Sequence, residues 1–195
     1  DEINKYFPKL QLKYPIFVKT YPLHPVTVKY LSGLTPIFSQ HRGVIHFIVS
    51  EVKKILDEPY NHLLTPDIIF DHFEDRIKEI PEYSSLVRIV YDYYKQNINA
   101  IINRENLALI ALSIIKIMIL TEISPYEKKK SAKDLAEILL KKISSFSSDI
   151  NYEFIKEGIL EVLVGHQMYI KKEGETYYID SSINEGIKIK SRIKA

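Results

Sequence analysis

Arg42 is the residue in this sequence whose type and position most clearly suggest chemistry. It follows the polar turn Ser39-Gln40-His41 and, with Gly43, opens an apolar stretch. The apolar spacing predicts a helix from about Arg42 to Asp57. A helix N-terminus is already partly positive, so an arginine there is unfavourable unless it reaches an anion. Its guanidinium and the free N–H groups of the first turn could bind phosphate together. The alternative is a solvated or salt-bridged surface arginine.

Other polar residues predict less specific chemistry. Metal-capable side chains gather in one stretch: His62, Asp67, Asp71, His72, Glu74 and Asp75. They lack the HExxH spacing of a zinc hydrolase, so a solvated acidic face is favoured and no metal site is predicted. The chain has no cysteine, which excludes disulfides, thiolate catalysis and cysteine-based zinc sites.

Charge and hydropathy limit the choice of partners. The formal net charge of +2 gives no overall attraction to nucleic acid. The longest apolar run, Leu107 to Leu120, contains Ser113 and Lys116 and is too short to cross a membrane. Lys116 is expected to extend along the apolar surface to water. No membrane contact is therefore predicted, and the chain is expected to be cytoplasmic.

The first half of the chain predicts a helical bundle over residues 1–101. Residues 1–24 contain Pro8, Pro15 and Pro22 and are expected to be extended. Helices are predicted from Pro25 to Gly33, from Arg42 to Asp57, from Pro66 (capped by Thr65) to Ile80, and from Glu82 to Ile101.

The second half predicts a winged helix over residues 102–182. Asn103 is expected to cap a buried helix that ends near Thr121, and Ser131 and Asp134 to cap a second helix. A third helix runs from Asp149 to Val164. A hairpin follows, with strands at 168–172 and 176–180 around Gly174. A basic tail, 183–195, completes a mostly α fold with a C-terminal β-hairpin.

A winged helix raises the possibility of DNA binding. The lysines placed to contact phosphates are Lys171 and Lys172 on the hairpin and Lys128, Lys129 and Lys130 before the second helix. The third helix argues against base reading, because Glu153, Glu157 and Glu161 are spaced to form one acidic stripe. An architectural role is therefore favoured. Non-specific DNA contact through the hairpin and the basic tail is a secondary expectation.

One block of the sequence resembles a known protein family. It begins with Tyr21-Pro-Leu-His-Pro25, continues with a helix and ends with Arg42-Gly43. The block is similar to the region after the nucleotide-binding core of large AAA+-type P-loop ATPases, including the ATPase component of BREX phage-defence systems. The resemblance covers about 35 residues closely, and the winged-helix order agrees with it. It implies that residues 1–101 are a lid and that Arg42 is a sensor 2 arginine that reaches the γ-phosphate of ATP. Gly43 and His24 would face the same nucleotide.

The chain departs from such ATPases in having no G-x-x-x-x-G-K-[ST] loop and no Walker B strand. It is therefore expected not to hydrolyse ATP. It is interpreted as the C-terminal, non-catalytic lid and winged helix of a larger ATPase whose core lies upstream. ATP and Mg²⁺ would bind only in that parent protein, and its partners would be the upstream core, further copies or defence-complex subunits. Two alternatives stay open, a DNA-binding winged-helix regulator and a protein–protein adaptor.

Overall fold

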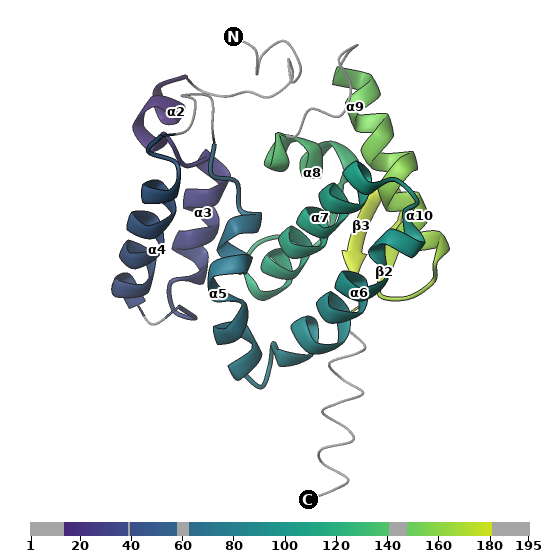
Figure 1. The fold of residues 1–195 in the computed structure, drawn as a ribbon, viewed down its shortest axis with the longest axis horizontal. Helices are drawn as coiled ribbons and strands as arrows, with labels where there is room; N and C mark the ends of the chain where they lie inside the picture. The colour runs from purple at the N-terminus through teal and green to yellow at the C-terminus, as the bar shows by residue number, and fades with distance from the viewer. Residues whose placement is uncertain (1–13, 39, 58–62, 141–147, 181–195) are drawn as a thin grey trace, which may run out of the picture.

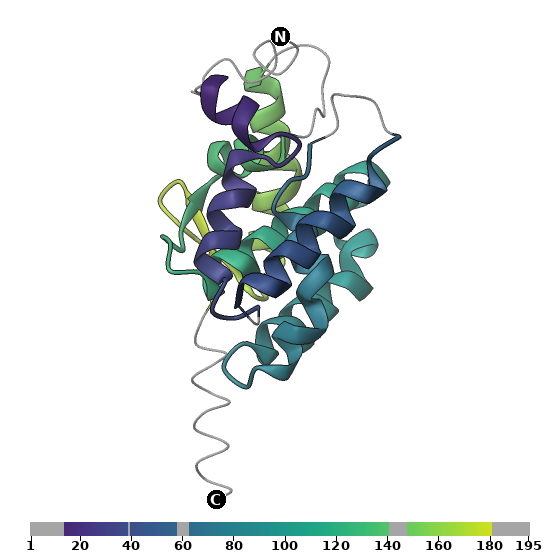
Figure 2. The same cartoon turned by 90° about the vertical axis from the view of Figure 1, so that its left-hand side faces the viewer.

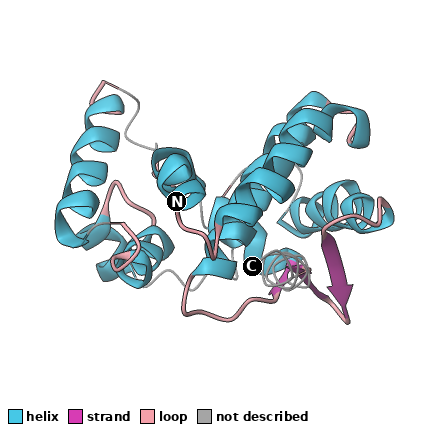
Figure 3. Cartoon of the chain, turned by 90° about the horizontal axis from the view of Figure 1, so that it is seen from below, coloured by secondary structure: helices cyan, strands magenta, loops and turns pink. Residues whose placement is uncertain are grey.

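A computed structural model describes residues 14–38, 40–57, 63–140 and 148–180. The predicted mostly helical fold is confirmed, and a small antiparallel sheet lies at one side of the helices (Figures 1 and 3). The predictions for residues 1–13, for His62 and for the basic tail at 183–195 fall outside the described residues.

The first helices are α2 (Tyr14–Thr20), α3 (Pro25–Leu34), α4 (Gln40–Lys54) and α5 (Asp67–Glu79). Helix α2 corrects the expectation of an extended segment there, since Pro15 sits at its second residue, where no N–H is needed. Figures 1 and 2 show α3 and α4 running in roughly opposite directions, so their starting residues lie at opposite ends of the pair. Leu23 and Leu64 form a bridge that holds the start of α3 against the approach to α5.

Helix α5 begins one residue later than predicted, and Thr65 does not cap it. The Thr65 hydroxyl donates to Asp67 Oδ1 at 2.6 Å, and Ser113 of a later helix donates to Asp67 Oδ2 at 2.7 Å. Pro66 occupies the N-cap position without a side-chain bond. Thr65 thus supports a tertiary contact of Asp67 instead of the local cap that its position suggested.

The predicted helix over 82–101 is interrupted in its first half by a π-helical turn, η1 (Leu86–Tyr91), which continues into α6 (Asp92–Ile101). Next comes α7 (Glu105–Ile123), with Arg104 at its N-cap position and no side-chain cap. The prediction of Asn103 as the cap is therefore wrong. Helix α7 packs on α5, η1 and α6 and also on α8, η2 and β3, so both predicted regions contribute to one apolar core.

The second region contains β1 (Lys130–Ser131), α8 (Ala132–Leu139), α9 (Ser148–Ile155), η2 (Lys156–Leu160), α10 (Glu161–Gly165), β2 (Ile170–Glu173) and β3 (Thr176–Ile179). The sheet order is β1-β3-β2, all antiparallel. The predicted hairpin is confirmed, with Gly174 at φ 58° in its turn. The predicted cap of α8 is confirmed as a reciprocal pair of bonds between Ser131 and Asp134. Strand β1 was not predicted.

Helix α7 is long and apolar enough to cross a membrane by length and composition, but 61% of its most apolar window is buried inside the protein. Lys116 in this helix reaches toward the surface as expected, but its ammonium ends in an ion pair. Its Nζ lies 2.7 Å from Oδ1 of the half-exposed Asp71 on α5, and 5.9 Å from the ring centroid of Tyr91. An ion pair at the edge of the helix packing explains how a charged residue fits a helix that is otherwise apolar.

Candidate functional site

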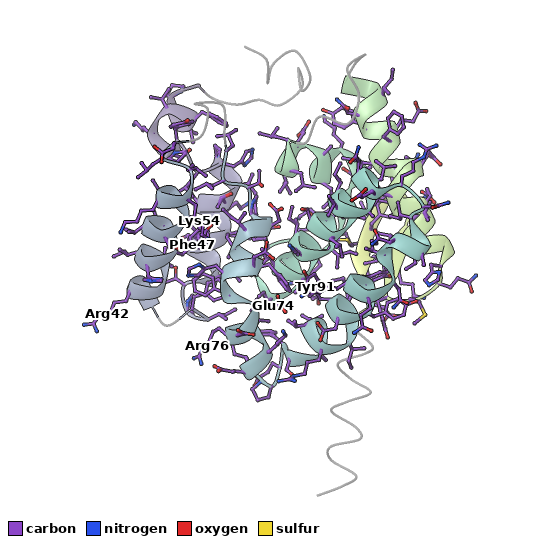
Figure 4. All side chains as sticks on the ribbon, in the orientation of Figure 1. Arg42, Phe47, Lys54, Glu74, Arg76 and Tyr91 are labelled. Carbon is purple, nitrogen blue, oxygen red and sulfur yellow. The ribbon has the colours of Figure 1, made fainter. Side chains whose placement is uncertain are left out.

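Arg42 lies in the first turn of α4 and is exposed to solvent. Figure 4 shows its side chain pointing away from the body of the molecule, whereas Phe47 on the same helix is buried between α4 and α5. Within the described part of the chain, Arg42 makes no ion pair and no hydrogen bond. The guanidinium therefore remains available at a helix end whose first N–H groups have no partner within the helix.

The exposed face of α4 continues from Arg42 along one side of the helix. Ile45 is 60% exposed and Val49 is 47% exposed, at positions three and seven residues after Arg42. This spacing places the three side chains on one stripe, which we call the α4 outer face. A stripe that begins with an arginine and continues with large apolar side chains has the composition of a protein contact surface.

Gly43 is explained by packing. A β-carbon on Gly43 would collide with the main-chain carbonyl oxygen of Phe38, in the turn that joins α3 to α4. That close approach seats Phe38 in the core, where its ring stacks on Phe73 with centroids 3.8 Å apart. Gly43 therefore fixes the position of the first turn of α4, and with it the position of Arg42.

His24 is buried and caps α3. Its exposed fraction is 1%, and its Nδ1 accepts a hydrogen bond from the main-chain N–H of Val26 at 3.1 Å. Burial lowers the pKa of His24 to about 4, so the ring is neutral near pH 7. With Nδ1 as acceptor, the proton sits on Nε2, which has no partner among the residues that the structure describes.

The structure does not bring His24 and Arg42 together. Each begins a helix, and α3, with 10 residues and hence a length of roughly 15 Å, separates the two ends. A single phosphate cannot contact both side chains across that distance. Arg42 is consequently the part of the predicted nucleotide site that remains accessible, with Gly43 as its support.

The metal-capable residues of α5 are engaged in ion pairs or, for Asp67, in hydrogen bonds. Glu74 pairs with Lys78, Asp71 pairs with Lys116, and His72 Nδ1 lies 3.3 Å from Glu51 Oε1 on α4. In the ranges that the structure describes, no group of three or more histidine or carboxylate side chains is placed to hold a metal ion. The α5 face thus ties α4, α5 and α7 together.

The lysines predicted to contact DNA are largely used inside the molecule. Lys128 donates to the main-chain carbonyls of Thr121 and Glu122 at the end of α7, a favourable place for a cation. Burial lowers the pKa of Lys128, and Glu122 partly opposes this. Lys129 pairs with Glu173 at 2.6 Å, and Lys130 donates to the carbonyl of Glu127.

Of the hairpin lysines, Lys172 pairs with Glu161 Oε1 at 2.6 Å, and Tyr177 donates to the same oxygen. Lys171 is half-buried on the opposite face of β2. Only part of the predicted basic surface is therefore free to meet phosphates.

The three glutamates of the predicted acidic stripe on the third helix have different neighbours. Glu153 and Glu157 line an open pocket beside the start of α7, and Glu161 pairs with Lys172 of the hairpin, whose pKa Glu161 raises, with a smaller contribution from Glu157. The π-helical turn η2 lies between them and adds a residue to the turn, so the pocket face continues at Val162 instead of Glu161. Hydrophobic periodicity assumes a regular α-helix, so the extra residue of the π-helical turn could not be predicted from it.

Comparison with known proteins gives one result. The family described as the DUF6079 second domain matches residues 1–182. Neither the curated proteins nor the solved structures contain a match to this chain. The match extends over both the helical bundle and the sheet, so the two regions belong to one family unit. The chain belongs to the DUF6079 second-domain family.

Proposed function

We propose that this chain is the non-catalytic lid and winged-helix part of a larger AAA+-type ATPase, and that Arg42 completes the nucleotide site of a preceding domain. The observation that carries the proposal is Arg42 at the start of α4, which is exposed and has no ion-pair partner among the described residues. A guanidinium there gains little from its own helix, whereas a bound phosphate would gain from both the guanidinium and the first-turn N–H groups. The family's description as a second domain is consistent with a preceding one.

The α4 outer face supports the same proposal. Ile45 and Val49 continue from Arg42 on the side that would meet the preceding domain. Their burial against that domain would hold the arginine near the nucleotide, where it stabilises charge on the γ-phosphate. ATP and Mg²⁺ would belong to the parent protein only, in the cytoplasm. Its partners would be further copies or defence-complex subunits.

The winged helix has an architectural role in this proposal. Lys128, Lys129 and Lys172 hold helix ends and strands together, which supports packing over DNA recognition. A DNA-binding regulator is therefore the weaker alternative. A protein–protein adaptor is the second candidate, and the exposed apolar residues of the α4 outer face favour it equally.

The test is ATP turnover by the full-length parent protein with Arg42→Ala, compared with wild type and with Lys53→Ala. Lys53 is an exposed cation in the last turn of the same helix, so it controls for the loss of a positive charge. Loss of one group that stabilises transition-state charge predicts a fall in turnover of roughly 100-fold or more for Arg42→Ala. Lys53→Ala should match wild type.

Circular dichroism of each variant checks that the fold is kept. Unchanged turnover in a folded Arg42→Ala protein would exclude the nucleotide role. In that case the adaptor candidate predicts that Ile45→Asp weakens association with the preceding domain or with another subunit. If Ile45→Asp leaves association unchanged, the adaptor candidate is excluded.

A further inference from the structure

A pocket of about 550 Å³ lies between the third helix of the winged-helix region and the start of α7. Its apolar wall comes mainly from Ile101, Leu107, Ile150, Phe154 and Val162. Two adjoining pockets of about 400 Å³ share residues with it, one through Leu107 and Phe154 and the other through Ile101 and Val162. Together they form a continuous depression along α9, η2 and α10, which we call the α9 groove.

The π-helical turn η2 and a glycine shape this groove. Gly158 lies within η2, and a β-carbon there would approach Leu107 Cδ1 to 3.3 Å. The absence of a side chain at Gly158 lets α7 come close at this point. The irregular turn then directs Glu157 and Val162 to the groove and Glu161 to the hairpin. Such turns are frequent where a helix forms part of a binding site.

The groove combines an apolar wall with a negative rim. Glu153 and Glu157 are exposed and form no ion pair with any residue in the described part of the chain. Arg104 at one end is the opposing charge. A segment suited to this surface would alternate apolar side chains with cations, so that the first enter the groove and the second meet the two carboxylates.

We propose that residues 183–195 of this same chain bind in the α9 groove. Their sequence alternates isoleucine with basic residues, in the order Ile187, Lys188, Ile189, Lys190 and then Arg192, Ile193, Lys194. This is the pattern that the groove would recognise. The proposal concerns a surface remote from Arg42 and does not depend on the nucleotide role of that residue.

The described chain ends close to one end of the groove. The main-chain N–H of Asp180 donates to the carbonyl of Tyr169 at 2.9 Å, and the Tyr169 ring packs on Tyr93 with centroids 5.4 Å apart. Tyr93 and His166, joined by a 2.6 Å hydrogen bond, line the pocket at that end. A segment that leaves Asp180 therefore starts beside the groove.

Length is sufficient for the segment to occupy the whole groove. A helix rises about 1.5 Å per residue, so the wall from Ile150 to His166 spans roughly 24 Å. An extended chain covers about 3.3 Å per residue, so about half of residues 181–195 would bridge it. Attachment at Asp180 also gives the segment an effective concentration on the order of millimolar, which favours it over a free competitor.

Disulfide trapping tests the proposal in the intact chain, which has no native cysteine. The test pair is Val162→Cys with Ile183→Cys, since Val162 lines the groove near the end where Asp180 lies and is 37% exposed. The matched control is Asn99→Cys with Ile183→Cys, because Asn99 is an exposed residue of α6 two positions before Ile101 that does not line the groove. A third variant adds Glu153→Lys and Glu157→Lys to the test pair.

The readout is the rate of intramolecular disulfide formation under mild oxidation at low protein concentration, followed by non-reducing gel and mass spectrometry. We expect the Val162 pair to close at least ten times faster than the Asn99 pair, and the charge reversal to remove that difference. Equal rates for the two pairs would overturn the proposal, as would a rate that charge reversal leaves unchanged. Disulfide-linked dimers as the main product would also overturn it, because the occupant would then come from a second copy. Thermal melting of each reduced variant confirms that it is folded.

Discussion

Lys116 on α7 and Asp71 on α5 form an ion pair of 2.7 Å in which the two side chains are buried to different degrees. The Lys116 side chain is 15% exposed, whereas that of Asp71 is 49% exposed. Removal of the carboxylate would leave a mostly buried ammonium without its partner. Removal of the ammonium would leave a carboxylate that water already reaches. The pair should therefore respond asymmetrically to substitution.

The first prediction follows from this asymmetry. Asp71→Ala should lower the free energy of unfolding by about 1–3 kcal/mol, and Lys116→Met should lower it by clearly less, since methionine fits the apolar helix packing. Urea unfolding of both single variants and of the double variant measures the effect. The double variant should resemble Lys116→Met. Equal losses for the two single variants would contradict the asymmetry.

The close approach of Gly43 to the main-chain carbonyl of Phe38 leads to a prediction about stability. Gly43→Ala forces a methyl group against the carbonyl of Phe38, so the turn before α4 must move, and we expect a loss of about 1–3 kcal/mol. Gly165→Ala is the matched control, because Gly165 is also helical and a β-carbon there meets no atom within 4 Å. Thermal melting should show a lower midpoint for Gly43→Ala and little change for Gly165→Ala. Equal midpoints would show that the turn relaxes without cost.

His24 predicts a pH dependence of stability. Its pKa is about 4 in the folded protein, against 6.5 for a solvent-exposed histidine, so the unfolded chain binds the extra proton first as pH falls. The stability that neutral His24 allows is present above pH 6.5 and is lost as the pH falls toward 4, by up to about 3 kcal/mol.

The measurement is urea unfolding of wild type and His24→Asn at several pH values between 7 and 4. Asparagine keeps a side-chain acceptor for the cap of α3 but does not titrate. The stability of His24→Asn should fall less steeply with decreasing pH than that of wild type, because asparagine does not take up a proton. Both proteins should still lose some stability, because their carboxylates titrate in this range. Parallel curves for the two proteins would mean that folding does not lower the pKa of His24.

The internal partners of the lysines predict weak DNA binding. Fluorescence anisotropy with a duplex oligonucleotide at 150 mM salt should give a Kd no tighter than the ~10⁻⁴ M end of the non-specific range. The double substitution Lys171→Glu with Lys172→Glu should change it little, since Lys172 is already paired with Glu161. Micromolar binding that this variant abolishes, with a steep salt dependence, would favour the DNA-binding alternative.

Local chemistry made several elements of this protein predictable from sequence. Pro25 at the first position of α3, the reciprocal Ser131–Asp134 cap and the Gly174 turn of the hairpin are each set by neighbours within a few residues. Their conformations depend on the fixed φ of proline, on a side-chain acceptor near free N–H groups and on the positive φ of glycine. Such determinants act over short range, so a single sequence contains them in full.

The tertiary structure decided the features that depend on distant residues. Strand β1 exists because it pairs with β3, and the π-helical turn η2 places Glu161 at Lys172 while Glu157 faces α7. For the candidate site, sequence identified Arg42 by its position at a helix start. Only the packing of α3 and α4 separated it from His24, and only the close approach of Phe38 explained Gly43. Contacts between residues far apart in the chain set these relationships, so they cannot be predicted from the local spacing of residues in the sequence.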